Sequence, residues 1–176
     1  RDSLGSDQIV CPGEVSWMTS GAAIAHIERT PEDLLASGSR MHGLQVWLAS
    51  PMSHELGEGH YSHHPAPSLP FSDSLGIHIR MIAGNGFCLT SPVPVLSPTI
   101  YAELRLQTAT TLLIPTEHQE RALYVLEGEA SVDGQPIEPR TLVVLEPGQE
   151  VNLCAQSDCH AVLIGGLGAS CTFAPL

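Results

Sequence analysis

The tripeptide His26-Ile27-Glu28 is the feature of this sequence with the clearest capacity for chemistry. In an extended strand, residues i and i+2 point to the same face, so an imidazole nitrogen of His26 and a carboxylate oxygen of Glu28 converge on one point. Such a pair supplies part of an octahedral site of nitrogen and oxygen ligands, the kind that non-haem Fe(II) uses. The spacing alone does not separate a metal site from a structural His–Glu pair, and both interpretations stay open at this point.

Other polar residues that could bind a metal are interpreted as structural. A stretch rich in proline and glycine contains four histidines, His54, His60, His63 and His64. Adjacent residues of a strand face opposite ways and cannot easily bind one ion, so we interpret this stretch as a solvated linker with incidental histidines. We also expect surface turn residues just before a later strand, at Glu117, His118, Glu120 and Arg121.

The elements that must position these residues are short strands. Apolar or alternating runs bounded by glycine or proline predict strands at 15–19, 24–29, 44–48, 77–83, 100–106, 112–114, 122–126, 130–132, 142–145, 151–153 and 161–164. Asp133-Gly134 predicts a tight hairpin turn. One short helix is expected at 30–35, capped by Thr30 and started by Pro31. The pattern predicts an all-β fold of sandwich or barrel type.

Composition restricts the class of partner. The 176 residues carry 7 basic and 19 acidic side chains, a formal charge of −12, which argues against direct binding to nucleic acid or to an anionic membrane surface. No apolar run approaches the length of a membrane span. The five cysteines form no CxxC motif, and we interpret them as buried free thiols of a cytoplasmic protein. Trp17 and Trp47 are expected in the core.

The turn signals divide the chain into two β units. Strands end near Ser50 and begin again near Gly76, and the stretch between them breaks the pattern with several prolines and glycines. Each unit has a Pro-Gly turn that introduces a short strand, at Pro12-Gly13 and at Pro147-Gly148. We therefore predict two small barrels, one within 1–50 and one within 76–176, joined by a crossover linker at 51–75.

Several segments together resemble the pirin family of two-barrel cupin proteins. They are the stretches 1–5, 12–21 and 24–28, the segment MHGLQVWL at 41–48, the segments 79–84 and 91–93, and YVLEGE at 124–129. The resemblance runs in order over nearly the whole chain. It implies two jelly-roll cupin barrels, in which 1–50 is the C-terminal part of an incomplete N-terminal barrel and 76–176 is the C-terminal barrel.

The resemblance also implies a metal site. Pirins hold their metal with three histidines and one glutamate, and His26 and Glu28 match the last two of these ligands. The other two histidines belong to an upstream H-P-H-R-G-F-E segment, which these 176 residues do not contain. We therefore expect a truncated piece of a longer protein, with a natural half-site as the alternative. The implied cofactor is Fe(II) or another divalent metal.

The resemblance implies two classes of function. The first is a quercetin 2,3-dioxygenase-type activity on a small aromatic, flavonol-like substrate. In it, His26 is a neutral ligand, and Glu28 is either a ligand or the base that deprotonates the substrate. The second is an iron-dependent regulatory module that binds a protein partner without catalysis. A metal-free form of the truncated chain is a third expectation, and in any case the piece by itself is expected to be inactive.

Overall fold

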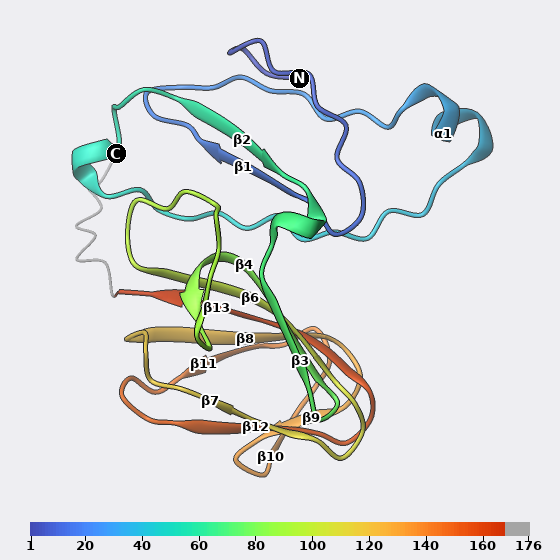
Figure 1. The fold of residues 1–176 in the computed structure, drawn as a ribbon, viewed down its shortest axis with the longest axis vertical. Helices are drawn as coiled ribbons and strands as arrows, with labels where there is room; N and C mark the ends of the chain where they lie inside the picture. The colour runs from blue at the N-terminus through green and yellow to red at the C-terminus, as the bar shows by residue number, and fades with distance from the viewer. Residues whose placement is uncertain (168–176) are drawn as a thin grey trace. The chain divides into compact units, whose positions relative to one another are not determined.

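A computed structural model describes residues 1–167 of the chain, and nearly all of their regular structure is β-strand. The chain divides into two compact units, Arg1–Ala66 and Pro67–Leu176 (Figure 1). The all-β class predicted from the alternating runs is therefore confirmed. No helix among the described residues is long and apolar enough to cross a membrane.

The first unit is built around a two-stranded antiparallel ribbon. Its elements are β1 (Val15–Thr19), α1 (Glu32–Ser37), the 3-10 turn η1 (Met52–His54) and β2 (His60–His64). Strands β1 and β2 pair in a register that sets Trp17 opposite Ser62. None of residues 1–66 is buried, so this unit has no hydrophobic core of its own. Trp47, expected in the core, is 91% exposed.

Two strands expected in this unit are wrong. Residues 44–48 have irregular structure, and 24–29 keep only a single bridge, in which His26 lies opposite Asp2. A strand requires a neighbour that accepts and donates its backbone hydrogen bonds, and 44–48 have no such neighbour among the described residues. The helix begins at Glu32 after Pro31, without a side-chain cap, so the expected cap at Thr30 is also wrong.

Conversely, β2 lies in the stretch that we interpreted as a solvated linker. Its sequence, HYSHH, lacks the apolar alternation that marks a strand, and it is a strand because β1 pairs with it along all five residues. Strand β3 (Phe71–Ser74) also lies in a stretch where no strand was expected, and it pairs with β4 (Ile77–Gly86). In both cases the partner, and not the local sequence, determines the extended conformation.

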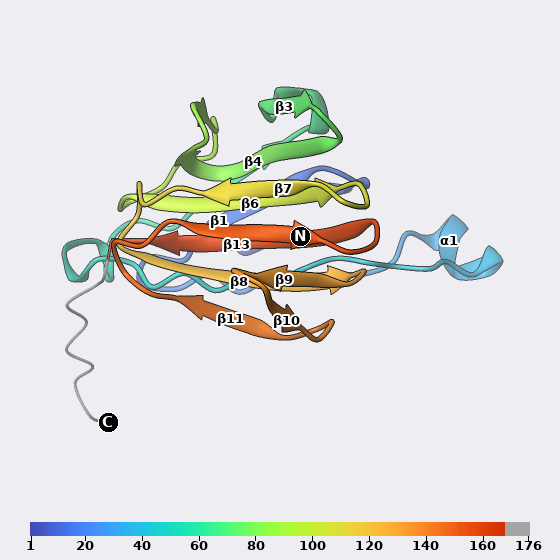
Figure 2. The ribbon, with the colours of Figure 1, turned by 90° about the horizontal axis from the view of Figure 1, so that it is seen from below.

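The second unit contains two antiparallel sheets. One has the order β11-β8-β13-β6-β4-β3 (Figure 2), with β5 paired to β4, and the other has the order β10-β9-β12-β7. The elements are η2 (Ala66–Ser68), β3 (Phe71–Ser74), β4 (Ile77–Gly86), β5 (Leu89–Thr90), β6 (Thr99–Leu106), β7 (Thr111–Ile114), β8 (Glu120–Glu127), β9 (Ala130–Val132), β10 (Gln135–Ile137), β11 (Leu142–Leu145), β12 (Val151–Ala155) and β13 (Cys159–Gly166).

The core of the second unit follows from the alternation along its strands. Alternate residues along β6, β8 and β13 face inward and most of them are buried, as Leu104, Leu123 and Leu163 show at 0% exposure. Leu153 of the second sheet joins the same cluster. Burying a leucine side chain contributes about 1.5–3 kcal/mol, so this continuous cluster stabilises the unit by itself. The two layers and the inward alternation are those of a cupin-type jelly roll.

The hairpin turn expected at Asp133-Gly134 is confirmed. Both residues have positive φ, 46° at Asp133 and 79° at Gly134, as a type I′ turn requires. The turn joins β9 to β10, which pair with Val132 opposite Gln135.

Candidate metal centre

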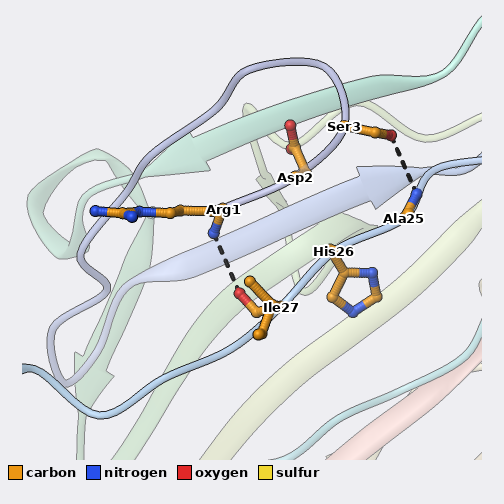
Figure 3. A pocket seen from close by; sticks show the side chains of 6 residues that line it. All are labelled: Arg1, Asp2, Ser3, Ala25, His26 and Ile27. Carbon is orange, nitrogen blue, oxygen red and sulfur yellow. Dashed lines mark hydrogen bonds between the residues drawn. The ribbon is translucent and has the colours of Figure 1, made fainter.

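His26 lies on a short pairing between the start of the chain and residues 25–27. The Ser3 amide donates to the Ala25 carbonyl at 2.8 Å, and the Ile27 amide donates to the Arg1 carbonyl at 2.9 Å. The Ser3 hydroxyl accepts a bond from the Ala25 amide at 3.1 Å, and the amino terminus donates to the Ile27 carbonyl at 3.2 Å (Figure 3). These bonds fix the backbone on both sides of His26.

The side chain of His26 faces an open hollow of about 330 Å³. The residues that line it are Arg1, Asp2, Ser3, Ala25, His26 and Ile27. Asp2 does not complete a site there, because its carboxylate turns back to accept the amides of Leu4 and Ser6 at 2.9 and 3.0 Å. Figure 3 shows the His26 ring turned away from Asp2.

The donors around His26 do not make a metal site by themselves. His26 and Glu28 are both exposed. Nowhere in residues 1–167 do three or more histidine, cysteine, aspartate or glutamate side chains come together in a way that could hold an ion. A divalent transition metal ordinarily requires at least three protein ligands. The described residues therefore fit at most half of such a centre.

The histidines of β2 form pairs rather than a cluster. His63 Nε2 lies 3.0 Å from Glu14 Oε2, and the Cys11 amide donates to the same oxygen at 2.7 Å. These two contacts lower the pKa of Glu14. His64 Nε2 contacts Ser62 Oγ at 3.0 Å, and partial burial lowers the pKa of His64. Since adjacent residues of a strand face opposite ways, His63 and His64 serve different sides of the ribbon.

Two residues expected at the surface are buried in the second unit. His118 is 5% exposed, and its Nε2 lies 2.8 Å from the Asn85 carbonyl oxygen. Arg121 is 2% exposed and donates from Nη1 to the Pro115 carbonyl at 2.7 Å. The surface-turn prediction is therefore wrong for both. The burial of Arg121 could have been predicted from the alternation of the strand, because Arg121 lies on the same inward face as Leu123 and Val125.

A cluster of ionisable side chains in the second unit surrounds Glu103 on β6. Its Oε1 accepts from Arg105 Nη2 at 2.7 Å and lies 3.0 Å from His160 Nε2. Arg80 Nη1 lies 3.9 Å from Oε2. The contact with His160 and then those with Arg105 lower the pKa of Glu103 to about 2. Burial, assisted by the charge of Glu103, raises the pKa of Tyr101 to about 12.

This cluster predicts an acid-sensitive contribution to stability. Because the pKa of Glu103 falls from 4.5 to about 2 on folding, its stabilisation is complete above about pH 5 and is lost as the pH falls toward 2. From about pH 5 to pH 2 the free energy of unfolding of the unmodified chain should fall as Glu103 takes up its proton. In Glu103→Gln we expect this fall to be smaller by about 2 kcal/mol, a figure below the one that the whole pKa shift would give, because solvent screens the carboxylate. Urea unfolding followed by circular dichroism measures this difference. The exposed Glu150→Gln is the control, and identical pH profiles for Glu103→Gln and the unmodified chain would contradict the assignment.

Two family models match the chain. The model described as "Pirin" matches residues 1–48, and the model described as "Pirin C-terminal cupin domain" matches residues 101–169. The first match contains both His26 and Glu28, and the second covers most of the strands of the second unit.

Curated relatives match over almost the whole chain. A pirin-like protein of Caulobacter vibrioides is 39% identical over 167 residues, which are 94% of this chain and 58% of the relative. The putative quercetin 2,3-dioxygenase PA1205 of Pseudomonas aeruginosa is 32% identical over 168 residues, 94% of this chain and 51% of the relative. The chain thus spans about half the length of the curated relatives that it matches.

Solved structures share the fold. A crystal structure of quercetin 2,3-dioxygenase from Acinetobacter baumannii superimposes with a TM-score of 0.85 at 30% identity, over 96% of this chain and 55% of that one. The crystal structure of GK1651 from Geobacillus kaustophilus superimposes with a TM-score of 0.84 at 25% identity, over 98% of this chain and 70% of that one.

Proposed function

Because this chain belongs to the pirin family, we propose that it forms part of a metal-dependent cupin oxygenase of the quercetin 2,3-dioxygenase type. The observation that carries the proposal is the likeness to the Acinetobacter baumannii quercetin 2,3-dioxygenase, which extends over 96% of the chain at 30% identity. The 32% identity with the putative Pseudomonas aeruginosa dioxygenase supports the same activity. Cytoplasmic residence, expected from the cysteine pattern, is part of the proposal.

In this proposal His26 and Glu28 are two of four metal ligands, and two histidines N-terminal to Arg1 complete the set. The bound Fe(II) or other divalent ion would supply Lewis-acid chemistry toward the oxygens of a flavonol. The pairing of residues 1–3 with 25–27 supports this role for His26, because hydrogen bonds from Arg1 and Ser3 to Ala25 and Ile27 hold the backbone on both sides of it. His26 and Glu28 alone do not suffice to retain the ion.

Glu28→Gln tests the function and also separates the two roles of this carboxylate. The assay is oxygen uptake with quercetin, on a form of the protein that carries the upstream histidines as well as these residues. If Glu28 removes the proton of the flavonol 3-hydroxyl, uptake falls about 100-fold or more while the metal stays bound. If Glu28 is a ligand, the metal content falls together with the uptake.

The matched control is Glu32→Gln, which changes an exposed glutamate at the start of α1. It is expected to leave both metal content and oxygen uptake unchanged. Unchanged uptake in Glu28→Gln would remove Glu28 from the active site. A metal-loaded form of the unsubstituted protein that consumes no oxygen with quercetin would refute the oxygenase proposal itself.

The second candidate function is a regulatory module that binds a protein partner. The observation that favours it is the exposed apolar surface of the first unit, where Met41 and Trp47 are each 91% exposed. The formal charge of −12 suits a protein partner better than DNA. A protein that binds the metal but consumes no oxygen would support this second function over the first.

A further inference from the structure

The second unit has an entirely aliphatic sheet edge that lacks the usual protection against pairing with another chain. Strand β11 is the last strand on one side of the larger sheet (Figure 2), and its four residues, Leu142–Leu145, are all aliphatic. The opposite edge, β3, carries Asp73 and two serines. In the smaller sheet, the edge strand β10 contains Pro136. Charges and prolines are the devices that keep edges from pairing, and β11 has neither within it.

The backbone groups of β11 that remain available follow from its pairing with β8. Thr141 offers its carbonyl to the Val125 amide at 3.4 Å, and the register continues with Leu142 opposite Tyr124. Successive residues of a strand direct their N–H and C=O groups to alternate sides. Val143 and Leu145 therefore bond toward β8, and Leu142 and Val144 direct their N–H and C=O groups to the free edge.

The sequence around β11 is close to self-complementary. Reading from 139 to 147 it is Pro-Arg-Thr-Leu-Val-Val-Leu-Glu-Pro, with Val143 at the centre. A proline stands at each end, a basic residue follows the first proline, and an acidic residue precedes the second. Leu142 and Val144, on one face, are 51% and 76% exposed. Arg140 and Glu146 are also exposed, and neither takes part in an ion pair within residues 1–167.

We propose that β11 is a homodimer interface, in which β11 of a second copy adds to the larger sheet antiparallel to the first, with Val143 on the twofold axis. Leu142 then faces Val144 of the second copy, and their free N–H and C=O groups form two pairs of ladder hydrogen bonds. Arg140 and Glu146 flank β11 just beyond the ladder, where Arg140 has a positive φ of 65° and the Glu146 carbonyl accepts from Arg121. In this register the Arg140 side chain of each copy comes to the same end as Glu146 of the second copy, so the charges match. The interface is isologous, since each copy offers the same strand.

Other arrangements lose part of this complementarity. A shift by one residue would place the free groups of Leu142 opposite residues whose own groups bond to β8. A shift by two residues would move Arg140 away from Glu146, so that the two charges no longer match. The remaining edge strand, β7, exposes only one large aliphatic side chain, Leu113 at 47%, and no charges flank it.

The first test measures the mass of the 176-residue chain by analytical ultracentrifugation over a range of concentrations. We expect a reversible monomer–dimer equilibrium. Val144→Lys should raise the dissociation constant more than about tenfold, because it places a charged side chain on the edge strand that pairs with the second copy. Leu113→Lys, on the edge of the smaller sheet, is the matched control and should leave the equilibrium unchanged. A chain that stays monomeric at all concentrations, or a dimer insensitive to Val144→Lys, would overturn the proposal.

The second test exchanges the charges and reads the backbone directly. Arg140→Glu and Glu146→Arg should each weaken the dimer several-fold, and the double substitution should restore it, because it re-forms the pairs in the opposite sense. Amide exchange should show that the N–H groups of Leu142 and Val144 become protected only on dimerisation. Protection of these two amides at every concentration would mean that another part of the same chain covers β11, and that would refute the second copy as its occupant.

Discussion

Alanine in place of His26 is expected to weaken binding of Fe(II) more than about 100-fold in a form of the protein that carries the upstream histidines. Loss of a residue that only supports a metal ligand already costs about 10–100-fold in affinity, and loss of a ligand costs more. The backbone around position 26 should be unaffected, because the bonds that hold it come from Arg1, Ser3, Ala25 and Ile27. Metal content after dialysis, measured by mass spectrometry, gives the result directly.

His54→Ala is the matched control for this substitution. His54 is another exposed histidine of the first unit, and its Nδ1 contacts only the neighbouring Ser53 Oγ, at 2.9 Å, among the bonds described for it. The control should keep its metal. The 176-residue chain should bind Fe(II) only weakly with or without His26, because it offers two donors where three or more are needed. Tight binding by His26→Ala, or by the 176-residue chain alone, would contradict the proposed ligand set.

Most strands of the second unit could be predicted from the sequence because they carry their own signal, whereas the short strands β3, β5 and β10 were not expected. Residues 142–145 were expected as a strand from a continuous aliphatic run, and β11 has the same limits. The Asp133-Gly134 turn was expected from residue types that tolerate positive φ, and both have it. In this unit local preference and burial agree, since alternate residues of each long strand enter one core.

The first unit could not be predicted in the same way, because its strands depend on partners. Residues 60–64 have no apolar alternation and become β2 through pairing with β1, whereas 44–48 have a strand-like sequence and no partner among the described residues. The His26-Glu28 motif was found from its spacing. What spacing could not give is that both side chains are exposed, without a third donor among residues 1–167.

Arg121 shows a different reason for failure. Its charge and its place next to Glu120 suggested the surface, although it has the inward phase of β8. A buried guanidinium is tolerated here because main-chain carbonyls surround it. Nη1 donates to Pro115, and Nη2 donates to Glu146 and Gln149 at 2.8 and 2.7 Å. Arg121 thus ties the loop before β8 to the turn between β11 and β12, a contact between segments distant in sequence.

Arg121→Met is therefore expected to lower the free energy of unfolding of the second unit by about 3 kcal/mol or more. Methionine preserves most of the buried volume but leaves three carbonyls without their donor, and each lost partner costs about 1–3 kcal/mol. Arg121→Lys should lose less than methionine does, because the ammonium keeps the charge, but it cannot reproduce the planar fork that reaches three acceptors.

Amide exchange of the central strands β8 and β13 measures this effect on the second unit alone, since both tryptophans lie in the first unit and would report on it instead. Arg105→Met is the matched control. The Arg105 side chain is 58% exposed, and its ion pair with Glu103 contributes at most about 1 kcal/mol. Equal decreases in the free energy of unfolding for Arg121→Met and Arg105→Met would show that the buried guanidinium does not hold the turns together. Position 121 would then need only a side chain that fills its volume, not one that donates hydrogen bonds.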